Sequence, residues 1–332
     1  MSDPVQVRVA APCRADLAGG TLDIWPLGLL HPEAVTVNMA LPVEVELVVD
    51  LGGGAGVVRH VSPDGEIRLL GSEDTARDLT AAVAFALEPA GGVQVQVVGQ
   101  APYRSGIGGS SSYGLALARA VGELVGSVPR EDELVALVRD LEARVLGVPT
   151  GEQDHWAAMR GGVLALHIEA GANRLEVLEI DPEWLNERVT VFYSGIRHRS
   201  GMVNWQVIRR RFDGDAATIE AFDTIADAAQ RCRAGLMAHD EAAVASAIRC
   251  DWKARRCLAP EVSPVEFEEL VDIASANGAT AVKGCGAGGG GSILIWHPPG
   301  AREAIASALK DESGRGWVLA AGAAVEGCRL LT

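Results

Sequence analysis

The sequence predicts an α+β protein, with strands concentrated in its first half and helices in its second half. In the first half, three segments alternate apolar and polar residues with the period of half-buried strands: residues 5–11, 42–50 and 93–98. In the second half, three longer segments have the composition of helices: residues 215–237, 240–256 and 264–277. Strands and helices that are segregated along the chain are typical of the α+β class.

The remaining elements follow from turn residues and helical spacing. LGGGAG at 51–56 marks a turn, and Pro63-Asp64-Gly65 predicts a second hairpin. Helices are expected over 74–88, 110–125 and 131–146, and a strand over 161–167. In the third of these helices, apolar residues recur at helical spacing: Leu134, Leu137, Val138, Leu141 and Val145.

The composition changes at Asp181-Pro182, and a new apolar strand follows at 189–195. We therefore expect two domains, residues 1–190 and residues 191–332. A length of 332 residues is sufficient for two compact domains.

Composition and charge exclude several classes of function. The formal net charge of −15 argues against a nucleic-acid-binding protein, which needs clustered Lys and Arg. No apolar run reaches the roughly 20 residues of a membrane span, and the N-terminus does not resemble a signal peptide. The six cysteines form no CxxC pair and no zinc-like spacing. We expect a cytoplasmic protein with reduced cysteines and no nucleic-acid or membrane partner.

The most informative segment is PYRSGIGGSSSY at 102–113, between a predicted strand and a predicted helix. Glycines let the backbone approach a ligand closely, and the start of a helix attracts anions. A serine hydroxyl beside phosphates can also ligate Mg²⁺. The loop lacks the Gly-Lys-Ser/Thr of a Walker motif, and a tight turn without a ligand is the alternative. The candidate anion-binding residues are Pro102, Gly106, Gly108, Gly109, Ser110, Ser111 and Ser112.

Two other segments carry candidate catalytic groups. VAAPCRADLAGGTLD at 9–23 contains Arg14, whose guanidinium suits a phosphoryl group, and Asp23, whose carboxylate suits sugar hydroxyls. GEQDHWAAMRGG at 151–162 contains Asp154, and Glu142 lies on the preceding predicted helix. Taken alone, each of these residues favours a structural interpretation: a strand end for Arg14, a helix cap for Asp23, a loop or cap carboxylate for Asp154 and a solvated helix residue for Glu142.

A third glycine-rich segment, KGCGAGGGG at 283–291, contains Gly286 and Gly288 and runs directly into an apolar strand. A dinucleotide-binding Rossmann loop instead opens a helix, so that interpretation is excluded.

Together these segments resemble the motifs of the GHMP kinases, the family of galactokinase, homoserine kinase and mevalonate kinase. PYRSGIGGSSS is similar to the family's P-x-x-x-G-L-G-S-S-A-A, with Gly109 in place of the first serine. GAGGGG, together with YSGIRHRSGMVN at 193–204, is closest to the heptose 7-phosphate kinase branch. The resemblance implies a two-domain fold, with a ribosomal protein S5 domain 2-like N-terminal domain and a ferredoxin-like C-terminal domain.

The resemblance also implies a role for each candidate residue. The loop would hold the phosphates of ATP, and Ser110 and Glu142 would serve Mg²⁺. Asp154 would be the catalytic carboxylate, with Arg14 close enough to keep it ionised. Asp23, Gly286 and Gly288 would lie at the acceptor, where His155 and Trp156 replace the branch's Gln and Tyr.

The expected function is phosphoryl transfer from ATP to a hydroxyl of a sugar or sugar phosphate. The cluster Arg197-His198-Arg199 is a candidate site for the phosphate of a sugar phosphate, or else a solvated turn or an intersubunit contact. The alternatives are a kinase of another small alcohol, a non-catalytic sensor with this fold, and a decarboxylase of the mevalonate-diphosphate type. Both a monomer and a homodimer are open.

Overall fold

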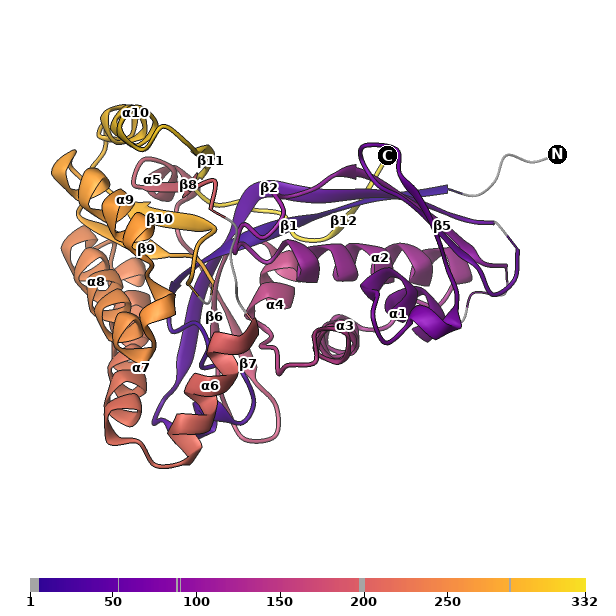
Figure 1. The fold of residues 1–332 in the computed structure, drawn as a ribbon, viewed down its shortest axis with the longest axis horizontal. Helices are drawn as coiled ribbons and strands as arrows, with labels where there is room; N and C mark the ends of the chain where they lie inside the picture. Colours follow the sequence, from indigo (N-terminus) through magenta and orange to yellow (C-terminus); the bar gives the residue numbers. More distant parts are fainter. Residues whose placement is uncertain (1–5, 53, 88, 90, 197–200, 287) are drawn as a thin grey trace.

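The computed structural model describes residues 6–52, 54–87, 89, 91–196, 201–286 and 288–332, with the backbone alone at 201–204. Within these ranges the chain forms an eight-stranded sheet and a four-stranded sheet, and helices pack against both (Figure 1). The predicted α+β class is confirmed. Among the described helices, none combines the length and the apolar character needed to cross a bilayer.

The first sheet is built on two long strands, β1 and β2, which run antiparallel to each other. Its order is β12-β1-β2-β5-β3-β4, and β6 joins β2 and β7 outside this path. The predicted hairpin at Asp64 is confirmed as β3–β4. The strands are β1 (Gln6–Ala18), β2 (Val35–Leu51), β3 (Val58–Val61), β4 (Ile67–Leu70), β5 (Val93–Gly99), β6 (Val163–His167), β7 (Arg174–Leu178) and β12 (Arg329–Leu331).

Helices α1 (Leu79–Ala86), α2 (Gly109–Val125), α3 (Glu131–Leu146) and α4 (Gln153–Arg160) belong to this first half. Helix α2 lies along β1 and β2 (Figure 1). Gly114 allows α3 to approach it closely, since an added Cβ would lie 2.7 Å from Val138. The helix predicted at 74–88 begins later, because Asp78 caps α1 by accepting hydrogen bonds from the backbone N–H groups of Thr80 and Ala81.

The second sheet has the order β11-β8-β10-β9. Its strands are β8 (Val189–Tyr193), β9 (Ala281–Gly284), β10 (Ser292–Trp296) and β11 (Trp317–Ala321). The helices of this half are α5 (Pro182–Asn186), α6 (Gly201–Phe212), α7 (Ala216–Met237), α8 (Glu241–Leu258), α9 (Val265–Ala276) and α10 (Arg302–Ser313). Helices α7, α8 and α9 confirm the three predicted ones, and Asp215 and Asp240 cap the first two.

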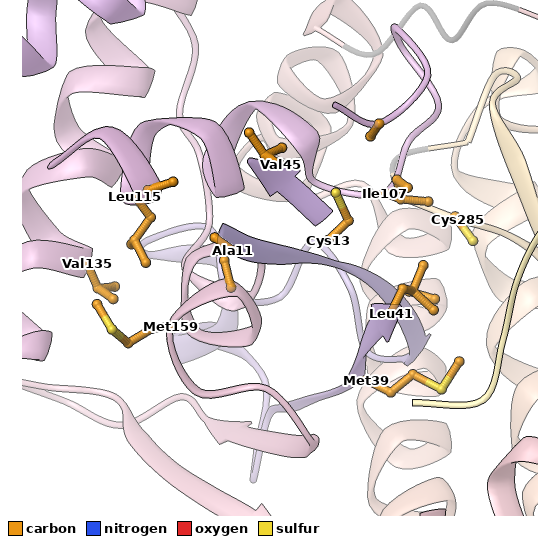
Figure 2. Packing of buried hydrophobic residues seen from close by; sticks show 14 of the residues in the cluster. Ala11, Cys13, Met39, Leu41, Val45, Ile107, Leu115, Val135, Met159 and Cys285 are labelled. Atoms are coloured by element: carbon orange, nitrogen blue, oxygen red, sulfur yellow. The ribbon is translucent and has the colours of Figure 1, made fainter. Parts of the chain in front are cut away.

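The hydrophobic core is continuous between the two halves. One cluster of buried side chains joins the first sheet and α2 to α7 and α8, and it includes Cys13, Ile107 and Cys285. Figure 2 shows Ile107 beside Cys285, on the opposite side of the view from Leu115 and Val135. The division near residue 190 stays a prediction; the last strand, β12, pairs with β1 in the first sheet.

Candidate active site

The glycine-rich loop connects β5 to α2 and ends at the N-terminus of that helix. Gly106 and Gly108 both have φ near 75°, a conformation that disfavours residues with a Cβ. Gly108 is the residue that caps α2, so the first N–H groups of the helix have no intrahelical acceptor. Ser110 is exposed in this first turn. The loop therefore has the backbone geometry of an anion-binding site.

Arg14 and Asp154 meet directly beneath this loop. The Arg14 Nε donates to Asp154 Oδ1 at 2.7 Å, and its Nη1 donates to the Gly106 carbonyl at 2.9 Å. Arg14 is buried on β1, whereas Asp154 is partly exposed in the first turn of α4. A Cβ at Gly108 would lie 3.1 Å from Asp154 Oδ2, so the loop packs against the carboxylate itself. The two predicted catalytic residues are thus brought together beside the predicted nucleotide loop.

Asp23 lies buried beside the turn that precedes α4. Its carboxylate accepts from the Gln153 backbone N–H at 2.9 Å and from Gln153 Nε2 at 3.2 Å. Burial is the main reason why the pKa of Asp23 rises to about 6, and the negative charge of Asp154 adds to it. Gly151 is required here, because a Cβ would lie 1.9 Å from Asp23 Oδ2. The segment 151–154 therefore contains Asp154 and also contacts Asp23 through Gly151 and Gln153.

Glu142 lies on α3 and faces the start of α2. Its Oε2 accepts a hydrogen bond from the Ser111 hydroxyl at 2.7 Å and lies 3.1 Å from His155 Nε2. Burial alone would raise the pKa of Glu142, but His155 and the hydroxyls of Ser110 and Ser111 outweigh burial and lower it. Glu142 is consequently an ionised carboxylate next to the loop. The sequence did not predict that His155 lies against Glu142.

The residues around Glu142 fit a bound Mg²⁺. Mg²⁺ prefers oxygen ligands and usually keeps several waters, binding to proteins through one or two carboxylates together with substrate phosphates. Glu142 supplies an ionised carboxylate, and Ser110 supplies an exposed hydroxyl. Within the described ranges no group of three or more His, Cys, Asp or Glu side chains forms a metal cage. This donor set suits an ion that is brought in with a nucleotide.

Three other predicted residues of the loop, Ser112, Pro102 and Gly109, make contacts within the protein. The Ser112 hydroxyl is buried and donates to the Pro12 carbonyl at 2.8 Å, which fixes α2 against β1. Pro102 is half-buried and opens the turn, where its carbonyl accepts from the Ser105 N–H. Gly109 lies close to Ala101, 3.2 Å from its Cβ to an added Cβ. Among the three serines, Ser110 is the one whose side chain is exposed.

The third glycine-rich segment packs directly on the first. A Cβ at Gly286 would lie 2.9 Å from the Gly106 carbonyl oxygen, and one at Gly291 would lie 2.6 Å from that of Ser105. A Cβ at Gly288 would lie 2.5 Å from the Val262 carbonyl oxygen. The glycine-rich segment at 283–291 therefore contacts the nucleotide loop closely through its backbone at Gly286 and Gly291. Arg197, predicted to hold a substrate phosphate, lies outside the described residues together with His198 and Arg199.

Comparison with known proteins identifies two domains of a single family. The model for the GHMP kinases N terminal domain matches residues 75–162, and the model for GHMP kinases C terminal matches residues 232–315. A D-glycero-alpha-D-manno-heptose 7-phosphate kinase of Campylobacter jejuni is 26% identical over 217 residues. That match covers 64% of this chain, and it spans 63% of the length of this curated relative.

Solved structures share the fold over nearly the whole chain. A D-glycero-D-manno-heptose 1-phosphate kinase from Bacteroides thetaiotaomicron superimposes with a TM-score of 0.75 at 20% identity, covering 98% of this chain and 99% of that one. Lactococcus lactis galactokinase, complexed with galactose, gives a TM-score of 0.78 at 15% identity, covering 98% and 95%. The predicted two-domain fold is confirmed. Since the two domain models match in order, on the two halves that meet at the glycine-rich segments, the chain belongs to the GHMP kinase family.

Proposed function

We propose that the protein is an ATP-dependent kinase that phosphorylates a hydroxyl group of a sugar or sugar phosphate. The observation that carries this proposal is the Arg14–Asp154 pair, at 2.7 Å, in contact with a glycine-rich loop at a helix N-terminus. A kinase has to place a carboxylate, a cation and an anion-binding loop around a single phosphoryl group. These three parts meet here.

Each part has a separate task in the proposed reaction. The backbone N–H groups at the start of α2 bind the phosphates of ATP. Asp154 accepts a hydrogen bond from the acceptor hydroxyl, orients it for attack on the terminal phosphorus, and takes up its proton as the new O–P bond forms and the bond to ADP breaks. The Arg14 guanidinium, fixed by Asp154 and Gly106, stabilises the charge of the phosphoryl group in transfer. Mg²⁺, when bound by Ser110 and Glu142, neutralises charge on the phosphate oxygens.

The acceptor is proposed from Asp23 and from the relatives. Asp23 is a buried carboxyl group that accepts a hydrogen bond from the backbone of Gln153, the residue before Asp154. A carboxyl group in this place suits hydrogen bonding to a polyhydroxyl compound. The curated relative and the first solved structure carry heptose phosphate kinase names, which supports a phosphorylated sugar. Binding of its phosphate by Arg197 stays a prediction, and an unchanged acceptor KM in Arg197→Ala would refute it. The cytoplasmic location is likewise part of the proposal.

The proposal is tested by measuring ADP release over a panel of sugars, sugar phosphates and polyols, with Asp154→Asn as the inactive control. Acceptor-dependent ADP release that depends on Mg²⁺ and is lost in the variant supports the kinase. ATP binding by calorimetry with no turnover of any acceptor would indicate a sensor. Release of carbon dioxide from a diphosphorylated acid would indicate a decarboxylase, and either result overturns the proposal.

A further inference from the structure

Behind Arg14, four charged side chains form a fully buried cluster that joins the two halves of the chain. Asp16 comes from β1, Asp251 and Arg255 from α8, and Lys283 from β9. The Lys283 ammonium donates to Asp16 Oδ2 at 2.8 Å and to Asp251 Oδ2 at 2.7 Å. Arg255 lies 3.9 Å from Asp16 and 3.4 Å from Asp251. Each of the four side chains is at most 3% exposed.

The cluster contains two carboxylates and two cations, so its formal charges balance. Burial alone would raise the pKa of Asp16, but Lys283, Arg255 and Arg14 outweigh burial and lower it. For Lys283 the directions are reversed: burial alone would lower its pKa, but Asp16 and Asp251 outweigh burial and raise it. Desolvating such charges is costly, and removing one partner from a buried pair destabilises a protein by about 3–5 kcal/mol. Replacing buried ion pairs with well-packed apolar residues is often neutral or stabilising, so stability by itself is a weak explanation for these charges.

Asp16 differs from Asp251 in what else it contacts. Its Oδ1 accepts from the Gly286 backbone N–H at 2.8 Å and lies 4.0 Å from Arg14 Nη1. It therefore touches both the catalytic arginine and the glycine-rich segment of the second half. Asp251 instead accepts from the Gly19 N–H at 2.9 Å.

Arg255 also reaches the glycine-rich segment and the acceptor side. Its Nη1 donates to the Gly286 carbonyl at 3.0 Å, and its Nη2 donates to the Thr21 hydroxyl at 3.2 Å. Gly286 is thus held at its N–H by Asp16 and at its carbonyl by Arg255. The cluster fixes the segment that packs on the nucleotide loop at Gly106.

We propose that Asp16 is a positioning residue that aligns the Arg14 guanidinium and fixes Gly286 against the nucleotide loop, with Lys283 and Arg255 as the counter-charges that permit a carboxylate there. Its effect on catalysis rests on the proposed kinase function. Its effect on Gly286 does not. An arginine displaced by about 1 Å from its productive position costs a reaction about 10²-fold in rate.

Two double variants separate positioning from stability. Asp16→Leu with Lys283→Met, and Asp251→Leu with Lys283→Met, each remove one carboxylate and one ammonium and leave a balanced Asp–Arg255 pair. Each also leaves one backbone N–H without its acceptor, Gly286 in the first and Gly19 in the second. The two variants are thus matched in charge, in buried polar groups and in apolar substitutions, and we expect equal denaturant midpoints.

Two readouts are compared between these variants. We expect the Asp16 variant to lose about 10²-fold in kcat and to exchange the Gly286 amide hydrogen much faster than the wild type. The Asp251 variant should keep both within a few-fold of the wild type. Equal losses in both variants, or wild-type kcat and exchange in the Asp16 variant, would overturn the proposal.

The exchange measurement requires no turnover, so it still decides the role of Asp16 at Gly286 if the protein proves not to be a kinase. Asp16→Asn together with Lys283→Met, which keeps the shape of the Asp16 side chain and the charge balance of the cluster, provides the test if the Asp16→Leu double variant does not fold. Its amide oxygen can still accept from Gly286, so we expect slow exchange at Gly286 together with a kcat at least tenfold lower. An unchanged kcat in this variant also refutes the alignment of Arg14 by Asp16.

Discussion

Replacing Asp23 with Asn tests the environment of the proposed acceptor site without any substrate. The pKa of Asp23 is about 6 in the folded protein, against an ordinary value of 3.8. The folded state therefore binds this proton more tightly than the unfolded chain does. The resulting stabilisation is complete below about pH 3.8 and is lost as the pH rises through 6. With about 1.4 kcal/mol per pKa unit, the loss is about 3 kcal/mol.

Asn is well suited to this position. Its amide oxygen can accept from the Gln153 backbone N–H, as Asp23 does at 2.9 Å. Its amide nitrogen can donate to Gln153 Oε1 once the Gln153 side-chain amide turns over. Gln153 Oε1 is buried and has no hydrogen-bond partner among the described residues. The substitution therefore removes the titrating proton while keeping the shape and the hydrogen bonds of the site.

The measurement is denaturant unfolding of both proteins between pH 4 and pH 7.5. Other titrating groups are common to the two proteins and cancel in the difference. We expect Asp23→Asn to gain about 2.5 kcal/mol of stability relative to the wild type between pH 4 and pH 7.5, while losing affinity for the acceptor. A difference in unfolding free energy that stays flat with pH would refute the argument that Asp23 is a buried, unfavourably placed carboxylate.

Three further predictions concern catalysis. Asp154→Asn should lower kcat by about 10²–10⁴-fold while ATP still binds, measured by coupled ADP release and calorimetry; near wild-type kcat would remove Asp154 from the mechanism. Ser110→Ala should weaken ATP binding in the presence of Mg²⁺ and leave it unchanged in its absence, and equal affinities would contradict the assigned metal role. Gly108→Ala should abolish activity because its Cβ would approach Asp154, whereas Gly126→Ala, also at positive φ but facing open space, should lose stability alone. Activity in the first variant would refute the close packing of the loop.

Local signals in the sequence were sufficient for most of the elements but not for the central pair. The glycines before α2 and the helical spacing in α3 are short-range patterns, and the hairpin at Asp64 follows from its turn residues. The position of Asp154 in the first turn of a helix was not foreseen, because α4 was not among the predicted helices. Arg14 and Asp154, 140 residues apart, were paired through the family resemblance and not through any local pattern.

The buried charges could not be predicted from the sequence. Asp251 and Arg255 are four residues apart on α8, a spacing that is also common on solvated helix faces. Lys283 was read as the first residue of a glycine-rich motif, and its partner Asp16 is 267 residues away. Likewise, nothing in the sequence separates Ser111, which contacts Glu142, from Ser110, which is exposed. Those distinctions depend on which way a side chain points in the folded state.

The pairing of β12 with β1 has a consequence for how the protein is made and dissected. Arg329–Leu331 pair with Arg8–Ala10 at the edge of β1, and the Arg329 guanidinium donates a hydrogen bond to Glu44 on β2. Because β12 is translated last, the first sheet can be completed only after the second half has been synthesised. Until then, the edge of β1 that pairs with β12 remains unpaired. An excised fragment 1–190 would carry that same edge permanently, exposed to pairing with other chains. The two halves are thus interdependent in biosynthesis, because the first sheet gains its last strand from residues 329–331.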